Sequence, residues 1–371
     1  MDKDSKKNNK KVLKRYDSKV IWAFFTLLFL GFLNTFLITL QLNKYTEGSN
    51  LYLLIHNIIY IVSSLFAFWI GINIPQVIWK RLSKLGFILV ILLFILSFTG
   101  IFRESYSFHK WLHLIGFNLE IGSVAKFFMI LYFARLITLR DVSKVPVASM
   151  KVILGVGMSI ILSILLLAHG DVYSSILVGL LLIASLLCLR FDMAKTVIYI
   201  ACYIIISFVV YLILPYSSSE IFGFSSSILP TYNDTTLLSF VGFSGNFNNN
   251  LFLLKDGIAL NFAGSTGIFL FDIVSILVLL FLCFKIFKIS SLTGREENFF
   301  GAFIAFGLTI WIFFQFIIVL GSLLHIYSAI PLSFPFVGLD GSDMVLLSLM
   351  LGIVMKQDQI RRLVKLESEN D

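Results

Sequence analysis

The chain has few charged residues and few cysteines. Of its 371 residues, 13% are charged and 58% are hydrophobic, whereas a soluble domain carries charge on about a quarter of its residues. This deficit excludes an ordinary soluble enzyme and indicates an all-α polytopic membrane protein. The three cysteines, Cys188, Cys202 and Cys283, all lie in apolar stretches. They therefore indicate neither a disulfide framework nor a metal-binding spacing.

Several well-known catalytic motifs are also missing. The sequence contains no phosphate-binding glycine loop, no H-E-x-x-H zinc motif and no nucleophile elbow. His109 and His113 have the four-residue spacing that places two side chains on one helical face. No third ligand stands nearby, so we expect no metal site there. No cofactor is indicated, although a divalent cation that neutralises an anionic substrate stays an open alternative.

Ten apolar segments approach or reach the length of about 20 residues that a membrane-spanning helix needs. We place them at 20–42, 51–73, 84–102, 117–138, 150–168, 172–189, 195–214, 265–287, 299–322 and 342–355. A tight turn makes 150–189 a helical hairpin. The first segment is not followed by a small-residue cleavage site, so we expect a retained helix rather than a signal peptide.

Lysine and arginine predict the orientation of these helices, because cytoplasmic connections carry an excess of both. Eight of them stand in the first 19 residues, and alternate connections are richer in them than the others. Both termini are then cytoplasmic, with flexible tails at 1–19 and 357–371 on either side of one membrane domain at 20–356. The basic tail adjoins an apolar helix, so we interpret it as an anchor on anionic membrane lipid rather than a nucleic-acid site.

One long polar connection, 215–264, interrupts the apolar chain and is extracellular in this orientation. Loops carry active groups because a rigid scaffold can aim their side chains, and connections of this length are usually functional or disordered. Glu220 and Asp234 lie in its polar part, whereas Asp256 stands just before the next apolar segment. Partial desolvation there suits Asp256 as a general base. The alternative is that Asp256 only caps the following helix.

Ionisable residues inside apolar segments are further candidates, because charge at membrane depth is costly. Lys126 lies six residues after Glu120, or about 9 Å further along a helix. It either pairs with a carboxylate or faces an anionic, lipid-linked head group. Asp171 opens a helix whose free N–H groups its side chain can cap. Asp272 either pairs with a buried cation or faces a wet cavity.

Four stretches resemble the SEDS family of shape, elongation, division and sporulation proteins, the RodA/FtsW-like group. In 107–137 the pattern R-W, G and F-Q-P-S-E-L-A-K is matched by Lys110-Trp111, Gly116 and Val124-Ala125-Lys126, with Glu120-Ile121-Gly122-Ser123 in place of Q-P-S-E. In 168–182 the pattern Q-P-D-L-G-T-A keeps Asp171 and Ser174. Gln315 and Gly321 match Q-x-x-x-N-x-G, with Val319 in place of asparagine. In 330–345 the pattern G-I-P-L-P-F-x-S-x-G-G-S is matched by Ile330, Pro331, Leu332, Phe334, Gly341 and Ser342.

The best-known site of that family is an aspartate in a pattern like H-T-D-F-I-F-A-V-I-G-E-E-L-G. Residues 254–267 are the counterpart, with Asp256, Ile258 and Gly267 aligned and Gly264-Ser265 in place of E-E. The resemblance covers about 20–356 and implies a peptidoglycan glycosyltransferase of the bacterial cytoplasmic membrane.

That resemblance also implies the substrate, the partner and the roles of residues. The substrate is lipid II, the undecaprenyl-diphosphate-linked disaccharide-peptide, and the partner is a class B penicillin-binding protein, a transpeptidase. Asp256 is the implied catalytic base. The implied substrate-binding residues are Lys126, Lys110, Trp111, Asp171, Glu120 and Ser342. The alternative function is that of a non-catalytic paralogue, which binds or transports a lipid-linked precursor or scaffolds a transpeptidase.

Overall fold

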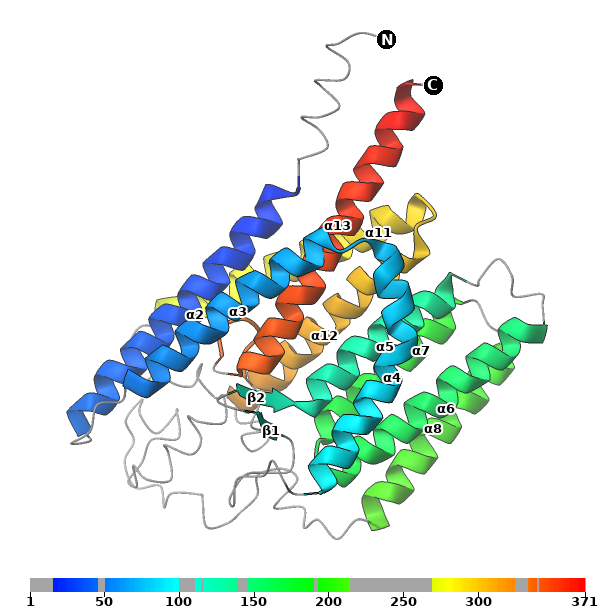
Figure 1. Ribbon diagram of the computed structural model, residues 1–371, viewed down its shortest axis with the longest axis horizontal. Helices are drawn as coiled ribbons and strands as arrows, with labels where there is room; N and C mark the ends of the chain where they lie inside the picture. The colour runs from blue at the N-terminus through cyan, green and yellow to red at the C-terminus, as the bar shows by residue number, and fades with distance from the viewer. Residues whose placement is uncertain are drawn as a thin grey trace.

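The computed structural model describes residues 16–45, 51–99, 111–114, 117–138, 146–189, 193–213, 269–323, 333–338 and 340–370. Within these ranges, helices and one β-hairpin form a bundle (Figure 1). The helices are α2 (Ser18–Tyr45), α3 (Leu51–Asn73), α4 (Gln76–Phe98), α5 (Ile121–Ile137), α6 (Pro146–Ala168), α7 (Val172–Cys188), α8 (Met193–Ile213), α11 (Phe269–Arg295), α12 (Phe299–Leu323) and α13 (Gly341–Asn370). The hairpin pairs β1 (Trp111–Leu114) with β2 (Phe117–Glu120).

Each predicted apolar segment corresponds to one helix of the described part, and the all-α polytopic fold is confirmed. A chain in lipid must satisfy its backbone N–H and C=O groups internally, so long apolar runs become helices. Six of the described helices are long and apolar enough to cross a membrane. α4 makes a seventh if its two parts, Gln76–Ser83 and Leu85–Phe98, which meet at 50°, form one span. The predicted hairpin at 150–189 is α6 followed by α7.

The residues just before α5 are not helical, contrary to the prediction of a helix from residue 117. Trp111 pairs with Glu120, and His113 pairs with Asn118, across the β-hairpin. Apolar and polar residues alternate in this stretch, a period that favours strands over helices. The helical spacing expected for His109 and His113 therefore does not apply, because His113 lies in β1 and His109 lies outside the described residues.

The prediction of a flexible tail at 357–371 is also wrong, because residues 357–370 are helical. α13 continues past the apolar run that was expected to end it. Asp358 is fully buried and pairs with Arg361 at 2.8 Å and Arg362 at 2.7 Å. Arg362 also lies 3.8 Å from Asp17, which precedes α2. These pairs, spaced by about one helical turn, extend α13 and tie it to the start of α2.

α5 lies at the centre of the bundle, where α4, α6, α7, α12 and α13 contact it. Fifteen of its residues are buried, and its apolar side chains point to all sides, as is typical of a helix enclosed by other helices. Lys126 lies within α5 and is 1% exposed. The fold therefore surrounds this lysine with protein rather than lipid.

α3 and α13 pack at very short range through two glycines. A Cβ added to Gly352 would lie 3.0 Å from the Gly71 Cα and closer still to the Phe68 carbonyl oxygen. Small residues at such contacts let two helix backbones approach closely inside a membrane. This contact fixes the position of α13, whose first turn contributes to the site described below.

We expect Gly352→Leu to force α3 and α13 apart. Overpacking of a well-packed contact costs about 1–3 kcal/mol or more, so the variant should unfold at a lower temperature in detergent. The matched control is Gly157→Leu in α6, because a Cβ at Gly157 would meet nothing within 4 Å. Thermal unfolding of both purified variants checks the contact, and equal midpoints would contradict it.

Candidate functional site

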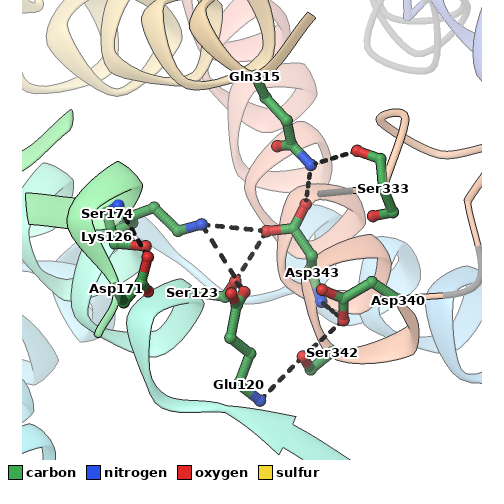
Figure 2. A network of polar contacts seen from close by, with 10 residues as sticks. All are labelled: Glu120, Ser123, Lys126, Asp171, Ser174, Gln315, Ser333, Asp340, Ser342 and Asp343. Carbon is green, nitrogen blue, oxygen red and sulfur yellow. Dashed lines mark hydrogen bonds and ion pairs between the residues drawn. The ribbon is translucent and has the colours of Figure 1, made fainter. Parts of the chain in front are cut away.

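A buried cluster of polar side chains surrounds Lys126, and we call it the Lys126 network (Figure 2). Its members are Glu120, Ser123, Lys126, Gln315 and Asp343. Glu120 ends β2, Ser123 and Lys126 stand on α5, Gln315 stands on α12, and Asp343 lies in the first turn of α13. The Lys126 Nζ atom lies 3.4 Å from Asp343 Oδ1 and 3.8 Å from Glu120 Oε2. The ammonium group therefore has two carboxylate partners inside the protein.

Asp343 is the most fully bonded member of the network. Its Oδ1 atom accepts a hydrogen bond from Ser123 Oγ at 2.8 Å as well as the contact with Lys126. Its Oδ2 atom accepts from Gln315 Nε2 at 2.8 Å, and the same Gln315 nitrogen donates to the Ser333 carbonyl at 2.9 Å. Ser123 Oγ also contacts Glu120 Oε2. A carboxylate from the last helix thus joins α5 to α12.

Ser342 connects the network to the β-hairpin. The Glu120 backbone N–H donates to Ser342 Oγ at 3.0 Å, and the Ser342 hydroxyl donates to Asp340 Oδ1 at 3.0 Å. The same Asp340 oxygen accepts from the Asp343 backbone N–H at 3.3 Å. The start of α13 is therefore held against the end of β2 by both side-chain and backbone bonds.

Asp171 caps α7, as predicted, and lies beside the network. Its Oδ1 atom accepts from the Ser174 backbone N–H at 3.1 Å. Its Oδ2 atom and the Ser174 hydroxyl lie against Gly122 of α5, where an added Cβ would overlap both. The glycine therefore allows the first turn of α7 to approach α5.

Two aromatic rings enclose the Lys126 ammonium. The Nζ atom lies 4.9 Å from the Tyr173 ring centre and 4.8 Å from the Trp311 ring centre, distances at which a cation is attracted to the ring face. Buried polar groups normally have hydrogen-bond partners. Around this lysine, five buried polar atoms have no partner in the described part of the chain. They are Tyr173 OH, Trp311 Nε1, Gln315 Oε1, Asp171 Oδ2 and Ser174 Oγ.

The network lies at the end of the bundle where α5, α7 and α13 begin, which is the outer end in the predicted orientation. The connection that carries Asp256 leaves from α8. Ser207, near the end of α8, hydrogen-bonds with Ser163 at 3.0 Å, and Ser163 bonds with Ser175 in the first turn of α7 at 2.6 Å. The end of α8 is therefore level with the start of α7, on the network side.

The structure brings four of the predicted site residues together, namely Glu120, Lys126, Asp171 and Ser342. Trp111 lies opposite Glu120 in the hairpin. Lys110 and Asp256 lie outside the described residues, and the same is true of the Asp272 side chain. Lys126 and Glu120 meet although six residues separate them, because the lysine side chain reaches back toward the start of α5.

Sequence reasoning did not select several members of the site, namely Asp343, Ser123, Gln315, Tyr173 and Trp311. Asp343 carried a usable signal, since it is an acidic residue at the edge of an apolar segment. Gln315 stood in a matched motif but was not chosen. The two aromatic residues had no signal, because tyrosine and tryptophan are common in membrane helices.

Known proteins resemble the chain over most of its length. A family model described as a cell cycle protein, that of FtsW, RodA and SpoVE, matches residues 18–235. The probable peptidoglycan glycosyltransferase FtsW of Haemophilus ducreyi is 26% identical over 369 residues, covering 94% of this chain and 91% of that protein. The protein of the same description from Coxiella burnetii is 24% identical over 374 residues, covering 92% and 95%.

Solved structures share the fold. One chain of a peptidoglycan synthase complex, studied for its coordination of polymerization and crosslinking, has a TM-score of 0.66 at 16% identity, covering 94% of this chain and 99% of that chain. The rod shape determining protein RodA of Thermus thermophilus has a TM-score of 0.58 at 14% identity, covering 94% and 98%. At these identities the likeness shows the fold alone.

Proposed function

We propose that this chain, which belongs to the FtsW, RodA and SpoVE family of cell cycle proteins, polymerises lipid II into glycan strands. It lies in the bacterial cytoplasmic membrane, as its family and its apolar helices require. The curated FtsW relatives support a peptidoglycan glycosyltransferase. We propose lipid II as the substrate, and cell elongation, division or sporulation as the process.

The observation that carries the proposal is the position of the Lys126 network. A buried cluster of charge is costly inside an apolar bundle, so such a cluster is usually kept for a function. We therefore expect the functional site at the end of the bundle where the Lys126 network lies. That end also receives the connection that carries Asp256, since α8 ends there. The network joins α5, α12 and α13 into a rigid frame, and a rigid frame is what a catalytic loop needs.

The proposed reaction requires few protein groups. Asp256 accepts the proton of an acceptor sugar hydroxyl as that oxygen attacks the anomeric carbon of the donor sugar. The bond from that carbon to the diphosphate breaks, and undecaprenyl diphosphate leaves. A cationic side chain stabilises the charge that develops on the leaving group, and Lys110 is the proposed residue for this role.

The structure changes the role that we propose for Lys126. Two carboxylates and two aromatic rings already compensate its charge, so it does not depend on a diphosphate for a counter-charge. Its partner Glu120 lies directly across the hairpin from Trp111, the neighbour of Lys110 in the chain. We therefore propose that Lys126 positions the hairpin and, through it, Lys110.

A second candidate function is a non-catalytic scaffold for a crosslinking partner. It is favoured by the uncharged Gly264-Ser265 pair, which replaces two glutamates of the resembled pattern. One solved relative belongs to a complex that coordinates polymerization and crosslinking. We propose a class B penicillin-binding protein as the corresponding partner of this chain under either function.

Purified protein in liposomes with labelled lipid II distinguishes the two functions. Glycan strands should form, and their rate should rise when the class B penicillin-binding protein of the same cell is added. A catalytically blocked version of that partner, with its transpeptidase serine changed to alanine, controls for crosslinking. A complex that forms but produces no strands would exclude the polymerase and favour the scaffold.

A further inference from the structure

We propose that Asp343 supplies, from the last helix, a counter-charge for Lys126 that position 123 of α5 can supply equally well. One acid besides Glu120 is needed, and it functions at either position. Asp343 is then a positioning residue, which acts on the reaction only through Lys126 and the hairpin. The effect on activity rests on the proposed function, whereas the effect on stability does not.

The geometry places the two positions at one spot. Ser123 Oγ and Lys126 Nζ approach the same atom, Asp343 Oδ1, at 2.8 Å and 3.4 Å. Residues 123 and 126 are three apart on α5, a spacing that places both side chains on one helical face. A carboxylate on residue 123 would therefore reach the ammonium from within α5, at the place that the Asp343 carboxylate now occupies.

Two further observations favour an exchange of roles. In the resembled pattern F-Q-P-S-E-L-A-K, a glutamate occupies the position of Ser123. This chain lacks that acid on α5 and instead has Asp343 on α13, beside the same lysine. Exchanging serine and aspartate between the two positions also leaves the number of buried atoms and charges unchanged. A well-packed core tolerates such volume-conserving exchanges best.

Glu120 does not make Asp343 redundant. Its carboxylate is further from Lys126, at 3.8 Å, and its side chain is 11% exposed, whereas the Asp343 side chain is 3% exposed. Asp343 also receives hydrogen bonds from Ser123 and Gln315. Asp343 is therefore the closer and the more deeply buried of the two acids, and it contributes a second counter-charge that Glu120 does not replace.

The test compares D343S, S123D and the exchange variant S123D/D343S with the natural protein. D343S leaves Lys126 short of one counter-charge, and S123D places two carboxylates side by side. Each single variant should lower the thermal midpoint in detergent and slow lipid II polymerisation about tenfold. The exchange variant should recover to within about threefold of the natural rate and should have a higher midpoint than either single variant.

A matched control removes a buried acid from α13 at a position far from Lys126. Asp358 is fully buried and paired with two arginines, so D358S should also lower the midpoint. S123D/D358S has the same composition as the exchange variant, and it should be no more stable than D358S. Rescue in this control would show a general effect of charge and would overturn the proposal.

The remaining outcomes separate this inference from the proposed function. An exchange variant no better than the worse single variant, in a protein that makes glycan, would overturn the inference and leave the function standing. A natural protein that makes no glycan would contradict the function, and the midpoints alone would then decide the inference. A D343S variant as stable and active as the natural protein would also overturn the inference.

Discussion

Asp256→Asn should remove most glycan synthesis and leave the helical bundle folded. An amide cannot take the proton of the acceptor hydroxyl, and a general base contributes about 10²–10⁴-fold to a rate. Asparagine is as good as aspartate at capping a helix. The substitution therefore separates a catalytic Asp256 from one that only caps the following helix, since the capping alternative predicts normal synthesis.

The initial rate of lipid II polymerisation by purified Asp256→Asn protein is the measurement. Asp234→Asn is the control, because Asp234 stands in the polar part of the same connection and should be dispensable. Both variants should elute from a sizing column like the natural protein. An Asp256→Asn rate close to that of Asp234→Asn would retire the catalytic assignment and favour the scaffold.

Lys126→Met should have the largest effect on stability. Methionine keeps an unbranched side chain but removes the charge, so Glu120 and Asp343 lose their ammonium partner at 3.8 Å and 3.4 Å. Removing one partner of a buried ion pair costs about 3–5 kcal/mol, because the remaining charge is left uncompensated. Glycan synthesis should fall with it, since the hairpin loses its anchor.

Folded yield and thermal midpoint in detergent check this expectation. Lys288→Met in α11 is the matched control, because Lys288 is exposed, and such surface changes usually alter stability by less than about 0.5 kcal/mol. A Lys126→Met protein as stable as Lys288→Met would mean that the ion pairs contribute little. A protein that is folded but inactive would instead assign Lys126 directly to the substrate.

The helices could be predicted from the sequence because each depends on local composition. An apolar run of sufficient length must be helical in lipid, and no knowledge of its neighbours is needed. The two errors arose where that rule does not apply. Residues 111–120 are short and alternating, and residues 357–370 are polar, so their structures depend on tertiary partners such as Ser342 and Asp17.

The site was only half predictable for the same reason. Lys126 and Asp171 could be selected because charge inside an apolar segment stands out. Glu120 was selected as well, but the partners of Lys126 on other helices were not, since nothing in one sequence shows that α5 contacts the start of α13. Asp343, Gln315 and Trp311 reach Lys126 only through the packing of three helices.

The distance along the chain between Lys126 and Asp343 sets the time that passes between the synthesis of the two residues. The two residues are 217 positions apart, so at about 5–20 residues per second the ribosome makes Asp343 about 10–40 s after the lysine. Until Asp343 is made, Glu120 is the acid nearest to Lys126 in the chain. α13 supplies the second carboxylate partner of Lys126 only when it is made. A chain truncated before α13 therefore leaves the ribosome without Asp343, and its Lys126 has Glu120 alone as a partner.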